Sequence, residues 1–125
     1  MSRQEWCAAM VSLFLRIDLN SQDHIGPGKI ELLEQIAERG SIAAAGRAMS
    51  MSYRRAWELV EQLNTIFGRP VVRSRTGGKS GGGAELTSLG YLIVGRYRAI
   101  QKAAEQASMN HVSALQAEIQ AKRIR

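Results

Sequence analysis

Residues 41–63 carry the sequence SIAAAGRAMSMSYRRAWELVEQL, which predicts two helices joined by a tight turn. The alanine-rich first part predicts a thin helix that another helix can approach closely, with Ser41 as its N-cap. After Ser50, Met51 is expected as an apolar plug in the turn and Ser52 as the cap of the second helix. This is the pattern of a helix-turn-helix, a motif that can enter a groove of DNA.

The second helix is expected to span residues 53–67 with one apolar face. Its inward positions repeat at helical spacing and are Ala56, Leu59, Val60, Leu63 and Phe67. Tyr53 and Trp57 share a face one turn apart. We expect Trp57 in the core, and we expect the hydroxyl of Tyr53 to reach a phosphate or a sugar.

Arg54 and Arg55 occupy the first exposed turn of this helix, where recognition helices contact base edges and phosphates. Both are therefore candidate DNA ligands. Further candidates in the motif are Ser41, Ser52 and Tyr53. The alternative for Arg55 is a solvated ion pair with Glu58 or Glu61 on the same helix. The two arginines alone leave both interpretations open, whereas the surrounding motif favours DNA.

A glycine-rich hairpin is predicted after the motif. Val71 and Val72 predict a short strand, and residues 85–87 predict the return strand. The glycines between them let the backbone approach a polyanion closely. Candidate DNA ligands here are Arg73, Arg75, Lys79 and Ser80. A disordered hairpin tip with incidental charge is the alternative, and it is compatible with DNA contact.

Residues 78–80 match the end of a Walker A phosphate-binding loop. Arg73, however, stands where the first glycine of that loop belongs, and glycines 81–83 replace the helix that should follow. His24 and His111 lie far apart, with no cysteine or carboxylate grouping near either. We therefore expect neither an enzyme nor a bound cofactor.

The segments on either side of the motif predict its scaffold. Residues 11–20 alternate apolar and polar side chains, which predicts a strand that pairs with a later hairpin or with another subunit. The next helix is expected to end at Gly40 and to bury Ile30, Leu33, Ile36 and Ala37. Thr87 should cap a last long helix with the apolar stripe Leu89, Leu92, Ile93, Ile100, Ala103, Ala104 and Ala107. A symmetric partner subunit would bury that stripe. The residues after Asn110 are helix-prone, and their end, residues 122–125, is expected to be a frayed and solvated tail.

Composition limits the class of protein. A chain of 125 residues suits one domain, and a net charge of +6 favours an anionic partner. Residues 41–83 contain seven basic residues and two acidic ones, and seven minus two places +5 of that charge there. The single Cys7 cannot form an internal disulfide, and no stretch is apolar enough to span a membrane. We therefore expect a protein of the reducing cytoplasm.

Taken together, these features resemble the N-terminal DNA-binding domain of the ModE molybdate-responsive regulators, which are relatives of the LysR-type winged-helix proteins. The resembling segments are residues 40–42, residues 51–53 with Ala56-Trp57, residues 76–84, and Leu86-Thr87 with Gly90. The resemblance implies a mainly α fold with a small β wing, a winged helix-turn-helix with a long C-terminal dimerisation helix. It divides the chain into an arm (1–11), a DNA-binding core with wing (12–86), a dimerisation helix (87–110) and a tail (111–125).

The resemblance also implies a homodimer that binds palindromic sites in double-stranded DNA near molybdenum-related genes. Its subunits would meet through the last long helix and the N-terminal strand. Full-length members sense molybdate through C-terminal modules, and because this sequence ends at Arg125 we do not expect it to carry that response. Ser50 stands where the family favours glycine, so a positive φ there would be strained. The alternative function is a winged-helix module that binds another protein and no specific DNA.

Overall fold

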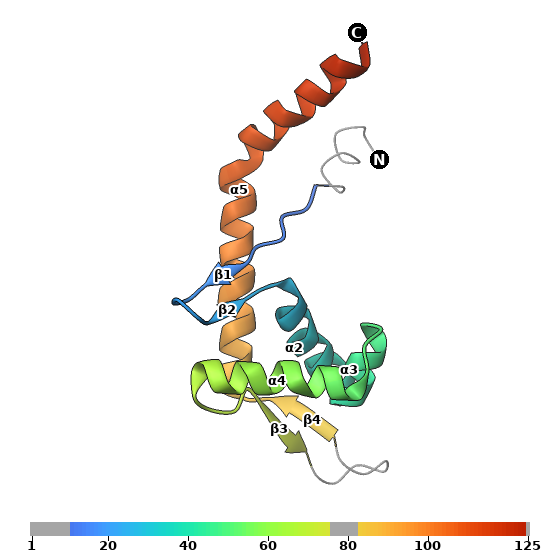
Figure 1. Ribbon diagram of the computed structural model, residues 1–125, viewed down its shortest axis with the longest axis vertical. Coiled ribbons are helices and arrows are strands. Elements are labelled where there is room, and N and C mark those ends of the chain that lie inside the picture. Colours follow the sequence, from blue (N-terminus) through green and yellow to red (C-terminus); the bar gives the residue numbers. More distant parts are fainter. Residues whose placement is uncertain (1–10, 76–82, 125) are drawn as a thin grey trace. The chain divides into compact units, whose positions relative to one another are not determined.

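The computed structural model describes residues 11–75 and 83–124, and the chain divides into two compact units. One unit is Phe14–Tyr97, and the other combines Met1–Leu13 with Arg98–Arg125. Along the chain the elements are β1 (Ile17–Asp18), β2 (His24–Ile25), α2 (Pro27–Arg39), α3 (Ile42–Ala48), α4 (Tyr53–Phe67), β3 (Val72–Arg75), β4 (Gly83–Leu86) and α5 (Ser88–Ile124) (Figure 1). The expected winged helix-turn-helix is therefore confirmed in the first unit.

The core of this unit lies between α2, α3, α4, the wing and the start of α5. Its fully buried large side chains are Tyr97, Ile30, Leu32, Leu33, Ile36, Leu63 and Val71. Pro27 begins α2 at a position where its missing N–H costs nothing, and Gly40 ends the helix at φ 79°. The expectation for Ala37 is wrong, because it is exposed while Leu32 is buried. The apolar face of α2 is rotated towards Leu32.

The helix-turn-helix forms as the sequence predicts. The Oγ atoms of Ser41 and Ser52 accept from the backbone N–H groups three residues on, Ala44 and Arg55, each at 3.0 Å. Met51 is half-buried against the core, as expected for a plug. Ser50 has φ 57° and is the only non-glycine residue with positive φ in the described part of the chain. The strain inferred from the glycine preference of the family at this position is therefore present.

Two short strands form the wing. β3 and β4 pair antiparallel, with Val72 opposite Leu86 and Arg75 opposite Gly83. The two strands lie below α4 in the view of Figure 1. At their base, the backbone N–H of Val71 donates to the Asn64 side-chain oxygen at 2.8 Å, which fixes the wing to the end of α4. The expected return strand is confirmed, except that Thr87 follows it and opens α5.

The strand expected over residues 11–20 is much shorter than predicted. Only Ile17 and Asp18 form β1, and they pair with His24 and Ile25 directly after the turn. Further up the chain, the Leu15 carbonyl accepts a hydrogen bond from the Tyr97 hydroxyl at 2.7 Å instead of joining a sheet. The alternating pattern of residues 11–20 therefore reflects one buried side of this segment. Leu15 and Ile17 on that side pack against the core.

The last helix is longer than expected. Residues 111–124 continue α5 to Ile124, in agreement with their helix-prone sequence. The expected apolar stripe splits within the chain: Leu89 and Ile93 are buried, whereas Leu92 and Ile100 are exposed. Although α5 has 37 residues, neither it nor any other helix in the described ranges is apolar enough to cross a membrane.

Candidate nucleic-acid interface

The first turn of α4 presents its polar side chains to solvent. The Ser52 cap fixes where this turn begins, and the next residues then project outward. The Arg54 side chain is 90% exposed and that of Arg55 is 54% exposed, while Tyr53 as a whole is 57% exposed. The structure therefore brings four of the predicted ligands together at the N-terminus of one helix, where backbone N–H groups also favour an anion.

Glu58 links the two arginines one turn further on. Its carboxylate lies 3.4 Å from Arg54 Nε and 3.5 Å from Arg55 Nη1. Exposed pairs of this kind contribute about 0.2–1 kcal/mol and are screened by salt. The ion pair that the sequence offered as an alternative is thus present with Glu58. It is weak enough to be exchanged for a phosphate, so it does not argue against DNA contact.

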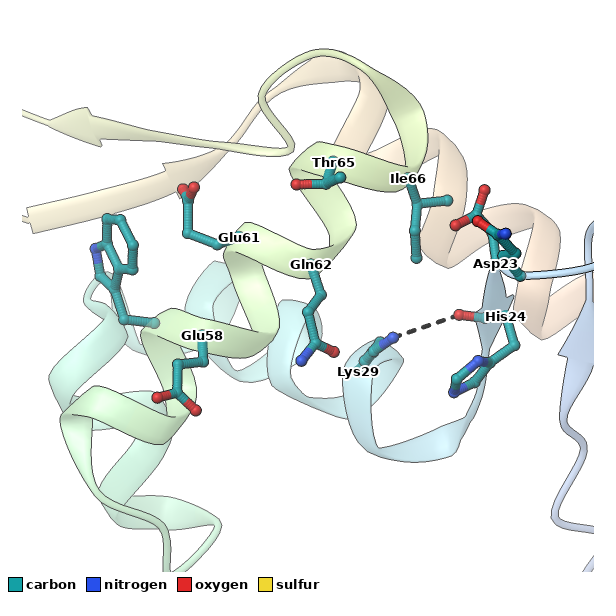
Figure 2. Close-up of a pocket in the computed structure, with 10 residues that line it drawn as sticks. Asp23, His24, Lys29, Glu58, Glu61, Gln62, Thr65 and Ile66 are labelled. Atoms are coloured by element: carbon teal, nitrogen blue, oxygen red, sulfur yellow. Dashed lines mark hydrogen bonds between the residues drawn. The ribbon is translucent and has the colours of Figure 1, made fainter.

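The positive region continues from α4 to the start of α2. Lys29 lies close enough to Arg55 and Arg16 for both to act on it, and its Nζ donates to the His24 carbonyl at 3.4 Å. Burial first, and then the neighbouring Arg55 and Arg16, lower the pKa of Lys29, while Asp23 opposes the shift. Figure 2 shows Lys29 and His24 across a groove from Gln62 of α4. Neither Lys29 nor Arg16 was among the predicted ligands, because both precede the helix-turn-helix in the sequence.

The wing supplies a second group of polar side chains. Arg73 Nε pairs with Glu85 across the two strands at 2.8 Å, and both side chains remain partly exposed. Arg75 is also exposed, but its guanidinium lies over the turn between α2 and α3, where a Cβ added to Gly40 would be 2.9 Å from Nη2. Arg75 therefore lies against the helix-turn-helix. The remaining wing candidates, Lys79 and Ser80, lie outside the described residues.

Trp57 contradicts the expectation that it belongs to the core, because it is 45% exposed. It lines a groove between α4 and the wing, whose other walls include Ser41, Tyr53, Arg73 and Ser74. The helical period could have indicated this position. The inward stripe of α4 is centred on positions 56, 59, 60 and 63, which leaves position 57 at its edge. The groove therefore joins Ser41, at the start of α3, to α4 and the wing.

Residues 11–75 and 83–124 contain no cluster of side chains that could bind a metal ion. No three histidine, cysteine, aspartate or glutamate side chains there are placed to hold one ion. The arrangement of the candidate residues is instead cationic side chains on a protruding helix, beside an aromatic groove and a wing. Such a surface suits contact with a polyanion.

Known sequences are similar to this chain. The chain is 35% identical over 95 residues to the transcriptional regulator ModE of Haemophilus influenzae, which covers 76% of this chain and 37% of the relative. It is 37% identical over 83 residues to the molybdenum-pterin-binding protein MopA of Rhodobacter capsulatus, which covers 66% of this chain and 31% of the relative. The chain thus spans about a third of the length of these relatives. The predicted resemblance to ModE proteins is confirmed.

Solved structures show the same fold. The DNA-binding domain of CbnR, solved in a complex with DNA, superposes with a TM-score of 0.54 at 20% identity over 70% of this chain and 95% of that chain. Full-length LysG of Corynebacterium glutamicum superposes with a TM-score of 0.55 at 23% identity over 75% of this chain and 30% of that chain. Residues 28–91 match the sequence model of the bacterial regulatory helix-turn-helix proteins of the lysR family. That segment spans α2, the helix-turn-helix, the wing and the start of α5, and the chain therefore belongs to the lysR family of bacterial regulatory helix-turn-helix proteins.

Proposed function

We propose that this chain is a transcriptional regulator that binds specific sites in double-stranded DNA as a homodimer. The observation that carries the proposal is the exposed pair Arg54 and Arg55 in the first turn of α4, the second helix of the helix-turn-helix. This turn is the part of a recognition helix that reaches base edges in the major groove. Tyr53 and the Ser52 hydroxyl lie in the same turn and add further donors towards DNA.

The wing and the start of α3 extend this contact along the DNA backbone. Ser41 is the N-cap of α3, and Arg73 on β3 lines the same groove between α4 and the wing. Arg73 and Arg55 now pair with exposed carboxylates, and phosphates can replace those carboxylates at little cost. Arg75, Lys79 and Ser80 complete the proposed set. Because each phosphate contact releases counterions, binding should weaken steeply with salt.

Self-association follows from the side chains that α5 leaves uncovered. Its exposed apolar residues are Tyr91, Leu92, Ile100, Met109, Leu115 and Ile119. A helix with such a surface is stabilised by burying it against another element. A two-fold partner is the simplest one, and it would place two recognition helices on a palindromic site. Phe14, which is 80% exposed, makes the N-terminal segment a second candidate for self-association.

The names of the relatives supply the target class. The ModE proteins are transcriptional regulators by name, and one of them is a molybdenum transport protein. MopA and MopB are molybdenum-pterin-binding proteins. We therefore propose that the sites bound by this chain lie near genes for molybdenum uptake or use. Mapping its sites across the genome would reveal these genes and the symmetry of the operator together.

Selection from a pool of random duplexes tests the proposal most economically. The purified chain should enrich a palindromic sequence, hold it in a mobility-shift assay against an excess of genomic DNA, and scatter light as a dimer. Enrichment of no sequence would contradict the proposal. An absence of binding to genomic DNA even at low salt, or a monomer in solution, would instead favour a winged helix that recognises another protein.

A further inference from the structure

Two aromatic side chains stand exposed on the recognition helix. Tyr53 and Trp57 are separated by one helical turn and keep 57% and 45% of their surface accessible. Both line the groove between α4 and the wing, and both line a small, largely apolar depression with Arg54 and Glu58. The same two rings therefore border the groove and the outer face of the helix.

Packing of the domain does not account for this exposure. The inner face of α4 is already filled by Ala56, Leu59, Val60 and Leu63, which are all buried. Leaving a large ring accessible to water forgoes about 25 cal/mol for every Å² of apolar surface. Exposed aromatic side chains beside a concave surface are a common feature of binding sites. The two rings are therefore available to a ligand.

The charge around the rings identifies the kind of ligand. Arg54 belongs to the depression itself, Arg55 is the next residue, and Arg73 forms part of the opposite wall of the groove. Glu58 and Glu61 also line these surfaces, so the three arginines leave a net positive charge around the two rings. Such a surface suits a molecule that is anionic along its backbone and apolar at one edge. In the major groove of DNA, the C5 methyl group of thymine is the apolar atom on a base edge. A depression of this type on the first two turns of a recognition helix is placed to receive it.

We propose that Tyr53 and Trp57 select operator positions by contacting the C5 methyl groups of thymine. This inference rests on the proposed DNA binding, and it assigns specificity to the rings as well as to the arginines. Arg54 and Arg55 hold phosphates or guanine, while the rings favour an A·T pair at a fixed position in each half-site. Removing the methyl group should then cost affinity only when the ring is present.

The test replaces single thymines of the selected operator by deoxyuridine, which lacks only the methyl group. For the unaltered protein, the Kd should rise about 3- to 5-fold for at least one thymine in each half-site, as expected for one buried methyl group. Trp57→Ala and Trp57→Gln should each bind the thymine operator about 10-fold more weakly and should show a Kd ratio near 1 between the two duplexes. Tyr53→Ala should show the same loss of discrimination at the same or the neighbouring position.

Leu19→Ala is the control, because it removes an exposed apolar side chain far from α4 in the sequence. Its ratio between the deoxyuridine and thymine duplexes should equal that of the unaltered protein. Three results would overturn the inference: no thymine sensitive to deoxyuridine, a ratio that persists without Trp57, or unfolding of both Trp57 variants. Enrichment of no operator would instead refute the proposed function, so the two failures are distinguishable.

Discussion

The backbone N–H of Ala84 donates a 2.8 Å hydrogen bond to the carbonyl of Gly40. Ala84 belongs to β4 of the wing, and Gly40 is the left-handed residue that ends α2 just before the helix-turn-helix. The Arg75 guanidinium lies over the same glycine. Wing and helix-turn-helix therefore share one anchor, which holds Arg73 and the first turn of α4 on one surface.

Gly40 is needed for two reasons that can be separated by mutation. Gly40→Ala and Gly68→Ala should each lower the free energy of unfolding by about 1–2 kcal/mol, because both glycines have positive φ. Only at Gly40 would the new methyl group also displace the guanidinium of Arg75, since nothing lies within 4 Å at Gly68. The Nε–H resonance of Arg75 should therefore shift in Gly40→Ala and stay in place in Gly68→Ala. Equal shifts in both variants would refute the contact.

Gly90 in α5 permits a close approach to the base of the wing. A Cβ there would lie 2.4 Å from the carbonyl oxygen of Val71, which also accepts the Thr87 N–H at 3.0 Å. Gly90→Ala should cost about 2 kcal/mol of stability in urea denaturation, because a backbone carbonyl cannot move cheaply. Gly95→Ala in the same helix meets no atom within 4 Å and should gain up to about 1 kcal/mol from helix propensity. A stabilised Gly90→Ala variant would contradict the packing described.

Ser50 carries backbone strain in the turn of the helix-turn-helix. Its φ of 57° is uncommon for a residue with a Cβ, and the cost is of the order of 1 kcal/mol. Ser50→Gly removes that strain but gives the unfolded chain more freedom, so stability should rise by no more than about 1 kcal/mol. Ser50→Val should lower the free energy of unfolding by about 1 kcal/mol or more, because a β-branched residue is strained at positive φ. Denaturation midpoints in the order Gly, Ser, Val would confirm the strain, and the reverse order would exclude it.

Lys29 should report on the charge of the recognition helix. Its pKa is lowered by burial and by the neighbouring Arg55 and Arg16, so the folded protein releases this proton at lower pH than the unfolded chain. Between the two pKa values the unfolded chain binds more protons, and the contribution of Lys29 to stability therefore rises with pH there. Arg55→Gln should raise the pKa of Lys29, as measured by NMR titration. Arg54→Gln should leave it almost unchanged, and an equal effect of both variants would contradict the geometry.

Much of the fold was predictable because local chemistry and tertiary packing agree in it. Ser41 and Ser52 cap the helices that their sequence positions predict, and Gly40 ends α2. The apolar period of α4 gave the buried positions 56, 59, 60 and 63. The wing followed from Val71 and Val72 and from the possible return strand at residues 85–87, on either side of a glycine-rich segment. Each of these features depends on neighbours within a few residues, which a sequence displays directly.

The failures involve partners that are distant in sequence. Residues 11–20 alternate as a strand does, but Leu15 hydrogen-bonds to Tyr97, 82 positions away, and most of the segment joins no sheet. Trp57 was expected in the core because aromatic side chains that share a helix face usually pack there, yet it is 45% exposed. The interaction of Arg75 with Gly40 depends on how the wing folds back. Amino-acid composition and the spacing of apolar residues do not reveal contacts between residues that are distant in the sequence.

The role of α4 in DNA recognition is tested by the salt dependence of operator binding when Arg54 and Arg55 are both changed to glutamate. Specific affinity should fall by at least about 100-fold. The slope of log affinity against log salt should become shallower by about 0.9 for every phosphate contact removed. Changing Lys102 and Lys122 of α5 to glutamate alters the net charge equally outside the helix-turn-helix and should preserve specificity. Unchanged operator affinity and slope in the arginine variant would contradict the assignment of α4 as the recognition helix.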